Sequence, residues 1–250
     1  MANRKTILIT GASSGLGQEM ARQFAAKGRN LALCARRADR LDTLKSELEA
    51  ANPGITVAIK SLDVCDYDQV FEVFRAFNEE LGGLDRVIVN AGLGKGQPLG
   101  TGYFHANRQT AETNFVAALA QCEAALELFR KAEAGHLVMI SSMSAMRGMP
   151  RNLTTYAATK AGVAALAEGI RADLLKTPIK VSTIYPGYIR SEINEKVKNT
   201  PFMVDTETGV RKMVQAIEKE VAEACVPAWP WAPMGFLMKR LPLKTVANMG

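Results

Sequence analysis

Short apolar runs alternate with amphipathic helix patterns from near the start of this chain. Residues 6–10 form an apolar run that ends at a glycine, after which Leu16, Met20 and Phe24 recur at helical spacing. Helix patterns separate the further apolar runs, which cover 31–35, 55–62, 86–89, 137–140 and 181–185. Runs such as 7–9 and 87–89 hardly alternate between apolar and polar residues, which is typical of strands covered on both faces. Strand followed by helix, repeated this often, predicts an α/β protein with a parallel sheet between two layers of helices.

The size and composition of the chain fit one globular domain. It has 250 residues, of which 48% are hydrophobic and 22% are charged, and no linker, low-complexity tract or fixed-period repeat divides it. We therefore expect a single domain over residues 1–250. The N-terminal sequence is neither a signal peptide nor an anchor, and no apolar stretch approaches the roughly 18 residues of a membrane-spanning helix.

Charge and metal-ligand patterns argue against two further classes of protein. The formal net charge is +6, but the two signs are mixed along most of the chain, which indicates solvated helix faces and no nucleic-acid partner. The four cysteines are scattered, and with only two histidines no metal-ligand spacing appears. We therefore expect no metal and a reducing, cytoplasmic compartment. His136 opens an apolar run and is expected to cap a strand.

A glycine-rich loop, Thr10-Gly11-Ala12-Ser13-Ser14-Gly15-Leu16-Gly17, joins the first strand pattern to the first helix pattern. Glycines let the backbone turn tightly and approach a pyrophosphate, and the helix that follows offers free N–H groups at its positive end. This position predicts a dinucleotide site, with a purely structural loop as the alternative. The cofactor contacts expected here are Gly11, Ser13, Ser14, Gly15, Leu16 and Gly17.

Two arginines, Arg36 and Arg37, follow the second strand pattern. Sites that prefer NAD usually place a carboxylate about 20 residues beyond the glycine loop, where it binds the ribose hydroxyl. Guanidinium groups in that place would instead attract a 2′-phosphate. We therefore predict NADP(H) as the cofactor, the alternative being that both arginines only face solvent.

Tyr156 and Lys160 stand four residues apart at the start of an alanine-rich helix pattern, so they share one helical face. A free tyrosine has a pKa of about 10, which is too high for proton transfer near neutral pH. A cation held close would stabilise the phenolate and lower that pKa. Such a pair is by itself more typical of a surface, so its weight comes from the motifs around it.

Those motifs form a larger pattern in one order along the chain. They are Thr10 to Gly17, Asp63-Val64, Asn90-Ala91-Gly92, Asn114, Ser141-Ser142, Tyr156 with Lys160, and Pro186-Gly187. In these motifs, over about residues 4–195, the chain resembles the short-chain dehydrogenase/reductase family. The resemblance implies a single-domain Rossmann fold whose doubly wound sheet has about seven parallel strands. It also implies an oxidoreductase that moves a hydride between a nicotinamide and a carbonyl or alcohol carbon.

The resemblance assigns roles to four catalytic candidates. Tyr156 would exchange a proton with the substrate oxygen, and Lys160 would lower its pKa and hold the nicotinamide ribose. Ser142 would hydrogen-bond the substrate oxygen, and Asn114 would hold a water that feeds protons through Lys160. Ser142 precedes Tyr156 by 14 residues, one more than is usual in the family, so Ser144 is an alternative for its role.

The resemblance also implies contacts along the whole cofactor. The residues expected there are Asp63, Val64, Asn90, Ala91, Gly92, Tyr156, Lys160, Pro186, Gly187 and Ile189. Asp63 and Val64 would flank the adenine, and Pro186, Gly187 and Ile189 would line the nicotinamide. Near the amide, where the family commonly has a threonine, Ser191 keeps the hydroxyl.

The resemblance thins out beyond about residue 200, which makes residues 200–250 a variable substrate-binding arm. Residues 206–224 carry an amphipathic helix pattern. The apolar segment 226–238 follows, contains both tryptophans and precedes a group of cations. Its three prolines are expected to forbid one long helix and to keep it irregular. Its composition suits a peripheral membrane contact, the alternatives being a cover over the pocket of a lipid-like substrate or a contact between subunits.

These patterns together predict an NADP(H)-dependent oxidoreductase that acts on a small-molecule carbonyl or alcohol. Homodimers or homotetramers are implied by the resemblance, with helices over 110–133 and 155–176 pairing between subunits. The alternative is a non-catalytic NADPH-binding regulator at a membrane, which the absence of the tyrosine, lysine or serine would have favoured. A sugar epimerase fits less well, because its glycine loop is spaced differently and it needs a longer substrate domain.

Overall fold

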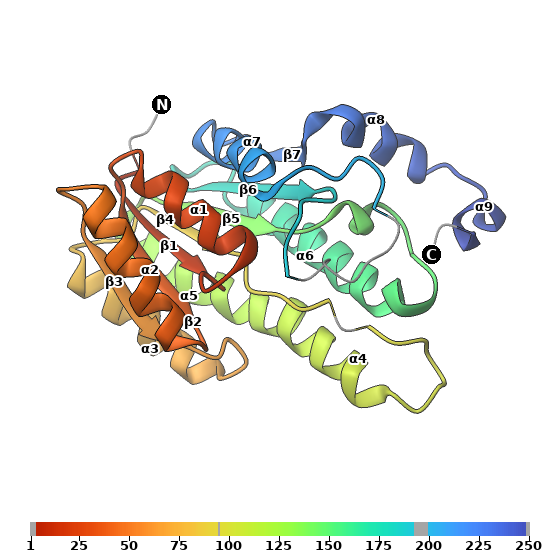
Figure 1. Cartoon of the computed structure of the whole chain (residues 1–250), viewed down its shortest axis with the longest axis horizontal. Coiled ribbons are helices and arrows are strands. Elements are labelled where there is room, and N and C mark those ends of the chain that lie inside the picture. The colour runs from red at the N-terminus through yellow and green to blue at the C-terminus, as the bar shows by residue number, and fades with distance from the viewer. Residues whose placement is uncertain (1–3, 95, 193–199, 249–250) are drawn as a thin grey trace.

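The computed structural model describes residues 4–94, 96–192 and 200–248. Its strands form one parallel sheet in the order β3-β2-β1-β4-β5-β6-β7 (Figure 1). Their bounds are β1 Thr6–Thr10, β2 Asn30–Ala35, β3 Val57–Ser61, β4 Arg86–Val89, β5 His136–Ile140, β6 Lys180–Pro186 and β7 Glu223–Val226. This confirms the doubly wound Rossmann sheet of about seven strands.

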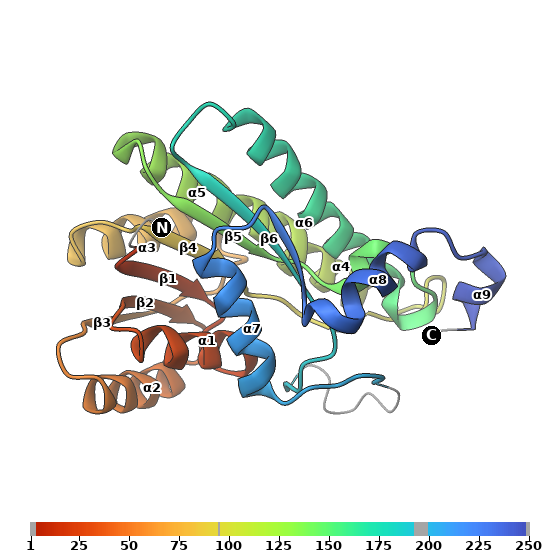
Figure 2. The same cartoon turned by 90° about the horizontal axis from the view of Figure 1, so that it is seen from above.

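Helices cover both faces of the sheet (Figure 2). One face carries α1 Gly15–Ala25, α2 Ala38–Ala51 and α7 Thr206–Glu218. The other carries α3 Tyr67–Glu80, α5 Ala117–Ala132 and α6 Thr154–Asp173. The remaining helices are α4 Phe104–Ala111, α8 Ala228–Met238 and α9 Leu243–Ala247, with short 3₁₀ turns at Met143–Met146 and Arg151–Leu153. Within the described ranges, no helix is both long and apolar enough to cross a membrane.

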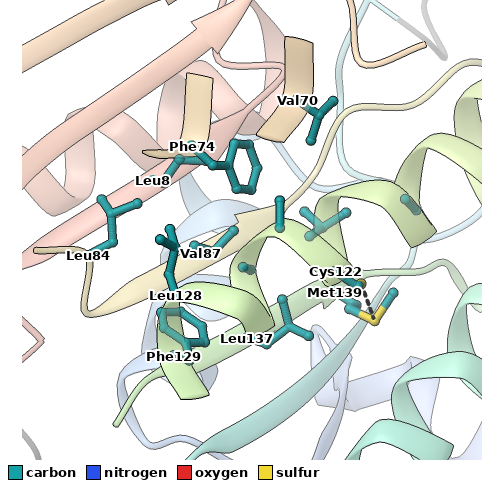
Figure 3. Close-up of a cluster of buried hydrophobic side chains, with 14 of the residues drawn as sticks. Leu8, Val70, Phe74, Leu84, Val87, Cys122, Leu128, Phe129, Leu137 and Met139 are labelled. Carbon is teal, nitrogen blue, oxygen red and sulfur yellow. Dashed lines mark hydrogen bonds between the residues drawn. The ribbon is translucent and has the colours of Figure 1, made fainter. Parts of the chain in front are cut away.

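Neighbouring residues of each central strand point to opposite faces, so the sheet contributes to two separate cores. Leu8 of β1, Val87 of β4 and Leu137 of β5 pack toward α3 and α5, as Figure 3 shows. Ile7 and Ile9 of β1 belong to the second core, beneath α1 and α7. All five side chains are fully buried. Because both faces are covered, these strands are apolar without alternation, as predicted.

The sheet reverses its order beside β1, which pairs with β2 on one side and with β4 on the other. In open α/β sheets, ligands bind outside the carboxyl ends of the strands at such a switch point. The glycine loop follows β1, Arg36 follows β2 and Asn90 follows β4. Three of the predicted cofactor segments therefore meet at this edge of the sheet.

The helix expected over 110–133 contains a π-helical turn, Glu112–Val116, which lies between α4 and α5. A π turn is wider than an α turn, and such turns are frequent at functional sites. Asn114 lies within the turn and is buried. The predicted catalytic asparagine therefore lies in a π-helical turn and not in a regular α-helical turn.

The helix expected over 206–224 is wrong beyond residue 218. Helix α7 ends at Glu218, and Glu220 adopts a left-handed φ of 50°. Residues 223–226 then form β7, an edge strand that runs parallel to β6. Side chains of β7 range from exposed to buried, so this strand has neither the long apolar run nor the regular alternation that would have predicted it.

The irregular conformation expected for the proline-containing segment is also wrong, because residues 228–238 form α8. Trp229 precedes a proline and is extended, with φ −100° and ψ 131°, so the regular helix begins at Pro230. Pro233 then lies inside the helix, at the position whose N–H would bond the carbonyl of Trp229. Pro230 therefore costs no helical hydrogen bond, whereas Pro233 removes the first one.

A buried network of charges lies at the amino ends of β4 and β5. Arg86, which is 1% exposed, donates from Nε to His136 Nδ1 (2.9 Å) and from Nη1 to Glu218. His136 Nε2 lies 2.8 Å from Ser182 Oγ, whose own hydrogen is donated to the carbonyl of Val221. The histidine is therefore neutral with its hydrogen on Nε2, and burial lowers its pKa to about 2. His136 begins β5, as expected.

Candidate active site

Hydrogen bonds fasten the glycine loop to the end of β4. Asn90 Nδ2 donates to the carbonyl oxygen of Thr10 (2.9 Å), while the N–H groups of Asn90 and Ala91 donate to Thr10 Oγ1 (3.0 and 3.1 Å). Ser14, the N-cap residue of α1, makes no side-chain capping bond to the helix. The first N–H groups of α1 therefore remain directed at any anion held by the loop.

Close contacts explain two of the glycines in this loop. Gly11 has a φ of +66°, and a Cβ added to it would lie 2.9 Å from Ala91 Cα. A Cβ on Gly17 would lie only 2.4 Å from the carbonyl oxygen of Gly11. At Gly15, by contrast, the nearest atom to an added Cβ is Ser191 Cβ at 3.5 Å. The backbone at Gly15 therefore has more open space around it than the backbone at Gly11 or Gly17.

Arg37 turns from the end of β2 onto the glycine loop. Its Nε donates to Ser13 Oγ (3.2 Å) and its Nη2 donates to Ser14 Oγ (2.6 Å). Arg36 is largely exposed, with Nη1 4.0 Å from Asp63 Oδ2. The structure therefore brings all five predicted residues together at the end of β2. Guanidinium and hydroxyl donors in one cluster fit a phosphate group.

A chain of hydroxyl groups leads to Tyr156 at the start of α6. Ser142 follows β5, and its Oγ accepts hydrogen bonds from the N–H (3.2 Å) and the hydroxyl (3.0 Å) of Ser144. Ser142 in turn shares a hydrogen bond with the Tyr156 hydroxyl. Among the described hydrogen bonds, Ser144 is linked to Tyr156 only through Ser142, so the geometry favours Ser142 as the serine beside the substrate oxygen. Two 3₁₀ turns, Met143–Met146 and Arg151–Leu153, lie between Ser142 and Tyr156.

Lys160 and Asn114 meet beneath Gly92. Lys160 is buried and its Nζ donates to the carbonyl of Ile140 (2.9 Å). Asn114 Oδ1 accepts from the N–H of Leu93 (2.7 Å), and its Nδ2 donates to the Leu93 carbonyl (2.9 Å). A Cβ on Gly92 would approach Asn114 Oδ1 to 3.2 Å and Lys160 Nζ to 3.5 Å. The predicted residues Gly92, Asn114 and Lys160 therefore lie close together.

The pKa of Tyr156 lies above its ordinary value in this structure, in contrast to the lowering expected from the sequence. Burial raises it, and the hydrogen bond from Ser142 opposes that effect. Burial also lowers the pKa of Lys160 to about 8. The Lys160 ammonium lies 6.0 Å from the centre of the Tyr156 ring, so the pair is close but makes no direct hydrogen bond among the contacts described.

The other predicted cofactor residues have mixed surroundings. Val64 is buried, and Asp63 Oδ1 accepts from the N–H of Cys65 (3.0 Å) at the end of β3. Pro186 ends β6, and Gly187 follows it against the ring of Trp231. The side chain of Ile189 points away from the site into the core beneath α7. Only the backbone of Ile189 can therefore contribute to a nicotinamide site.

Sequence reasoning missed the apolar wall next to Ser142. Met143, Tyr185 and Trp231 form a buried cluster, against which Met146 and Tyr188 pack. Trp231 and Tyr188 meet edge to face with ring centres 5.7 Å apart. The composition of 226–238 indicated an apolar segment, but which of its residues turn inward depends on where α8 lies.

Sequence reasoning also missed two charged residues beside Arg37. Arg40 lies in the first turn of α2, and Glu192 lies beyond β6; Glu192 Oε1 accepts from Arg40 Nη1 at 2.8 Å and its Oε2 from Arg37 Nη1 at 3.3 Å. Arg40 was detectable as a third arginine close to Arg36 and Arg37 in the sequence. Glu192 was not, because it is far from the arginines in the sequence. The described part of the chain contains no cluster of His, Cys, Asp and Glu suited to a metal.

Comparisons with known proteins show the family to which the chain belongs. The family model described as short chain dehydrogenase matches residues 5–201. The chain belongs to the short-chain dehydrogenase/reductase family. An uncharacterized oxidoreductase of Mycobacterium tuberculosis is 54% identical over 239 residues, which cover 96% of this chain and 94% of the relative.

Two solved structures of the family share the fold of this short-chain dehydrogenase/reductase. A short-chain dehydrogenase from Sphingobium yanoikuyae in complex with NADPH has a TM-score of 0.82 and 25% identity, covering 96% of this chain and 94% of its own. The bulky-bulky ketone specific alcohol dehydrogenase from Comamonas testosteroni has a TM-score of 0.80 and 26% identity, with 96% and 92% covered.

Proposed function

We propose that this chain is an NADP(H)-dependent oxidoreductase that interconverts a carbonyl and an alcohol. The observation that carries the proposal is the cluster of Ser142, Tyr156 and Lys160, which lies at the same carboxyl edge of the parallel sheet as the glycine loop. An acid–base hydroxyl, a hydrogen-bond donor for an oxyanion and a buried cation are the groups that such a reaction needs. When bound, the nicotinamide group supplies or accepts the hydride.

Tyr156 is the proposed acid and base. In reduction, its hydroxyl donates a proton to the substrate oxygen, and in oxidation its phenolate removes one from the alcohol. Ser142 is polarised by two hydrogen bonds from Ser144. Its own hydrogen can therefore turn from Tyr156 to the substrate oxygen as negative charge develops there.

Lys160 and Asn114 support that proton transfer. With a pKa of about 8, Lys160 still carries its proton at neutral pH, and its charge favours the phenolate. Its ammonium would also hold the ribose of the nicotinamide. The Asn114 side chain is occupied by Leu93 and by Thr159 (3.3 Å). We propose that a water for proton supply is held by the main chain of the π-helical turn.

The arginine cluster gives the first prediction, on the choice of cofactor. We expect NADPH to bind at least about tenfold tighter than NADH, equivalent to about 1.4 kcal/mol. Arg37→Ala should remove most of that difference, because Arg37 is the guanidinium fixed against Ser13 and Ser14. Dissociation constants from nicotinamide fluorescence measure both effects.

Arg75→Ala is the matched control, since Arg75 is exposed and pairs only with Glu127 among the described ion pairs. Equal affinities in the unmodified protein would contradict the preference.

The wall next to Ser142 indicates the class of substrate. Met143, Met146, Tyr188 and Trp231 are large, apolar or aromatic, and α8 holds them in place. We propose a carbonyl or alcohol flanked by bulky apolar groups, including lipid-like molecules, in line with the ketone specificity named for the Comamonas relative. NADPH oxidation followed by absorbance, with ketones and aldehydes of increasing size, tests this. Faster turnover of small polar carbonyls than of bulky apolar ones would contradict it.

The outer side of the arm supports a peripheral membrane contact as a further role. Trp229, Phe236, Leu237 and Leu243 are exposed, and they adjoin the cations Lys239, Arg240 and Lys244. Exposed apolar groups beside cations suit an interface with anionic lipid.

The second prediction tests this surface. The protein should sediment with anionic liposomes at low salt and less so at high salt, because salt screens the basic contacts. The double variant Phe236→Ser and Leu237→Ser should bind less, whereas Leu99→Ser, which changes an equally exposed leucine elsewhere, should bind normally. If the unmodified protein stays in the supernatant at low salt, the segment serves only the pocket or a subunit contact.

We also propose that the chain forms homodimers or homotetramers through α5 and α6. Val116 and Leu119 are partly exposed at the start of α5, and they offer apolar surface for such a contact. Sedimentation equilibrium distinguishes these states from a monomer.

A further inference from the structure

The side chain of Glu192 reaches Arg37 and Arg40 at the end of β2. It lies on the segment that follows β6, and it is half-exposed. The residue before it, Ser191, lies over Gly15, with its Cβ 3.5 Å from the place a Cβ on that glycine would take. This segment therefore passes over the part of the loop that is open to a pyrophosphate.

The carboxylate of Glu192 is held by the same groups that suit a phosphate. One oxygen accepts from Arg40 Nη1 (2.8 Å) and the other from Arg37 Nη1 (3.3 Å). A hydrogen bond with Arg40, and to a smaller degree one with Ser14 and the charge of Arg37, lower the pKa of Glu192. The side chain is therefore an anion at neutral pH, and Arg37 shares its donors between Glu192 and the two serines of the loop.

We infer that Glu192 is an internal competitor for the 2′-phosphate of the cofactor and so sets the ratio of NADP(H) to NAD(H) affinity. This inference extends the proposed NADP(H) preference and concerns a residue outside the proposed chemistry. A phosphate placed on Arg37 would lie within reach of the Glu192 carboxylate, and two anions on one guanidinium repel each other. The Glu192 side chain must therefore leave Arg37 and Arg40 before a 2′-phosphate can bind these two arginines.

The competition acts on one of the two cofactors only. NAD(H) carries a neutral 2′-hydroxyl, so its ribose does not repel the carboxylate and leaves the pairs with Arg37 and Arg40 intact. The ion pairs are exposed, and exposed pairs are weak. The Glu192 carboxylate therefore reduces the affinity for a 2′-phosphate without abolishing it. Removing its charge should strengthen binding of the phosphorylated ligand alone.

The experiment compares two adenosine probes that differ only in the 2′-phosphate, 2′,5′-ADP and 5′-AMP. Titration calorimetry is carried out with the unmodified full chain, with Glu192→Gln and with Glu80→Gln. Glu80 is a matched control, because it is an exposed carboxylate paired with Lys60 at the far end of α3. We expect Glu192→Gln to bind 2′,5′-ADP about three- to tenfold tighter, with 5′-AMP affinity within about twofold. Glu80→Gln should match the unmodified protein.

Each outcome separates this inference from the cofactor preference itself. If the unmodified chain prefers 2′,5′-ADP but Glu192→Gln leaves its affinity unchanged or weaker, the NADP(H) proposal stands and the competitor is overturned. If only Glu192→Gln prefers 2′,5′-ADP, the competitor is supported and the preference of the unmodified chain is not. If neither protein distinguishes the two probes, both ideas fail.

Discussion

Tyr156→Phe should reduce kcat by at least about 1000-fold while NADPH affinity stays within about twofold. The substitution removes only the hydroxyl oxygen that shares a hydrogen bond with Ser142. Without it, no group in the described cluster can pass a proton to the substrate oxygen at that position. The ring remains, so the fold and the cofactor site should be preserved. Single-turnover oxidation of NADPH measures the loss, and fluorescence titration measures the retained binding.

Two serine variants make this prediction more specific. Ser142→Ala should impair turnover far more than Ser144→Ala, because Ser144 acts on Tyr156 only through Ser142. If Ser144→Ala is the worse of the two, the extra residue between Ser142 and Tyr156 has been placed wrongly. Full activity of Tyr156→Phe would remove the acid–base role altogether.

Arg86→Met should lower the free energy of unfolding by about 3 kcal/mol, although Arg86 lies far from the chemistry. Its guanidinium is fully buried and bonds His136 Nδ1, Glu218 and the carbonyl of Ile217. Removing it leaves a buried nitrogen acceptor unpaired and weakens the neutralisation of Glu218, which keeps only Arg29 among the described ion pairs. Urea unfolding followed by circular dichroism measures the change.

The control for this variant is Arg108→Met. Arg108 is exposed and pairs with Glu112 at 3.5 Å on the helix surface, where ion pairs contribute little. Its urea midpoint should match that of the unmodified protein. Arg86→Met should also retain its NADPH affinity in the absence of urea, because the network lies at the opposite ends of the strands. An unchanged midpoint for Arg86→Met would show that the network contributes nothing to stability.

The sequence was most informative where one segment carries both the pattern and the function. The central strands β1 and β4 were predicted because burial on both faces makes each of them an apolar run. The glycine loop and the pair Tyr156 and Lys160 were predictable because their spacing within one element fixes their geometry. Local chemistry of this kind needs no knowledge of the tertiary structure.

The rest depends on segments that meet only after folding. β7 was missed because it is a short, partly exposed edge strand. The helical turns of α8 were missed because several prolines in one segment predict an irregular backbone, whereas Pro230 begins the regular helix and Pro233 lies near its start. Glu192 reaches Arg37 from 155 positions away, and Trp231 reaches Gly187 through the path of α8. The raised pKa of Tyr156 has the same origin, since burial is a property of the folded site.

The π-helical turn that contains Asn114 restricts the mutations that this part of the chain can accept. Because each residue of a helix advances it by about 100°, loss of a single codon from residues 112–116 would rotate all of α5 relative to α4. The apolar face of α5, which now rests on α3 and the sheet, would then turn toward water, or Asn114 would leave Leu93. This stretch should accept exchanges of one amino acid for another more readily than any change in its length.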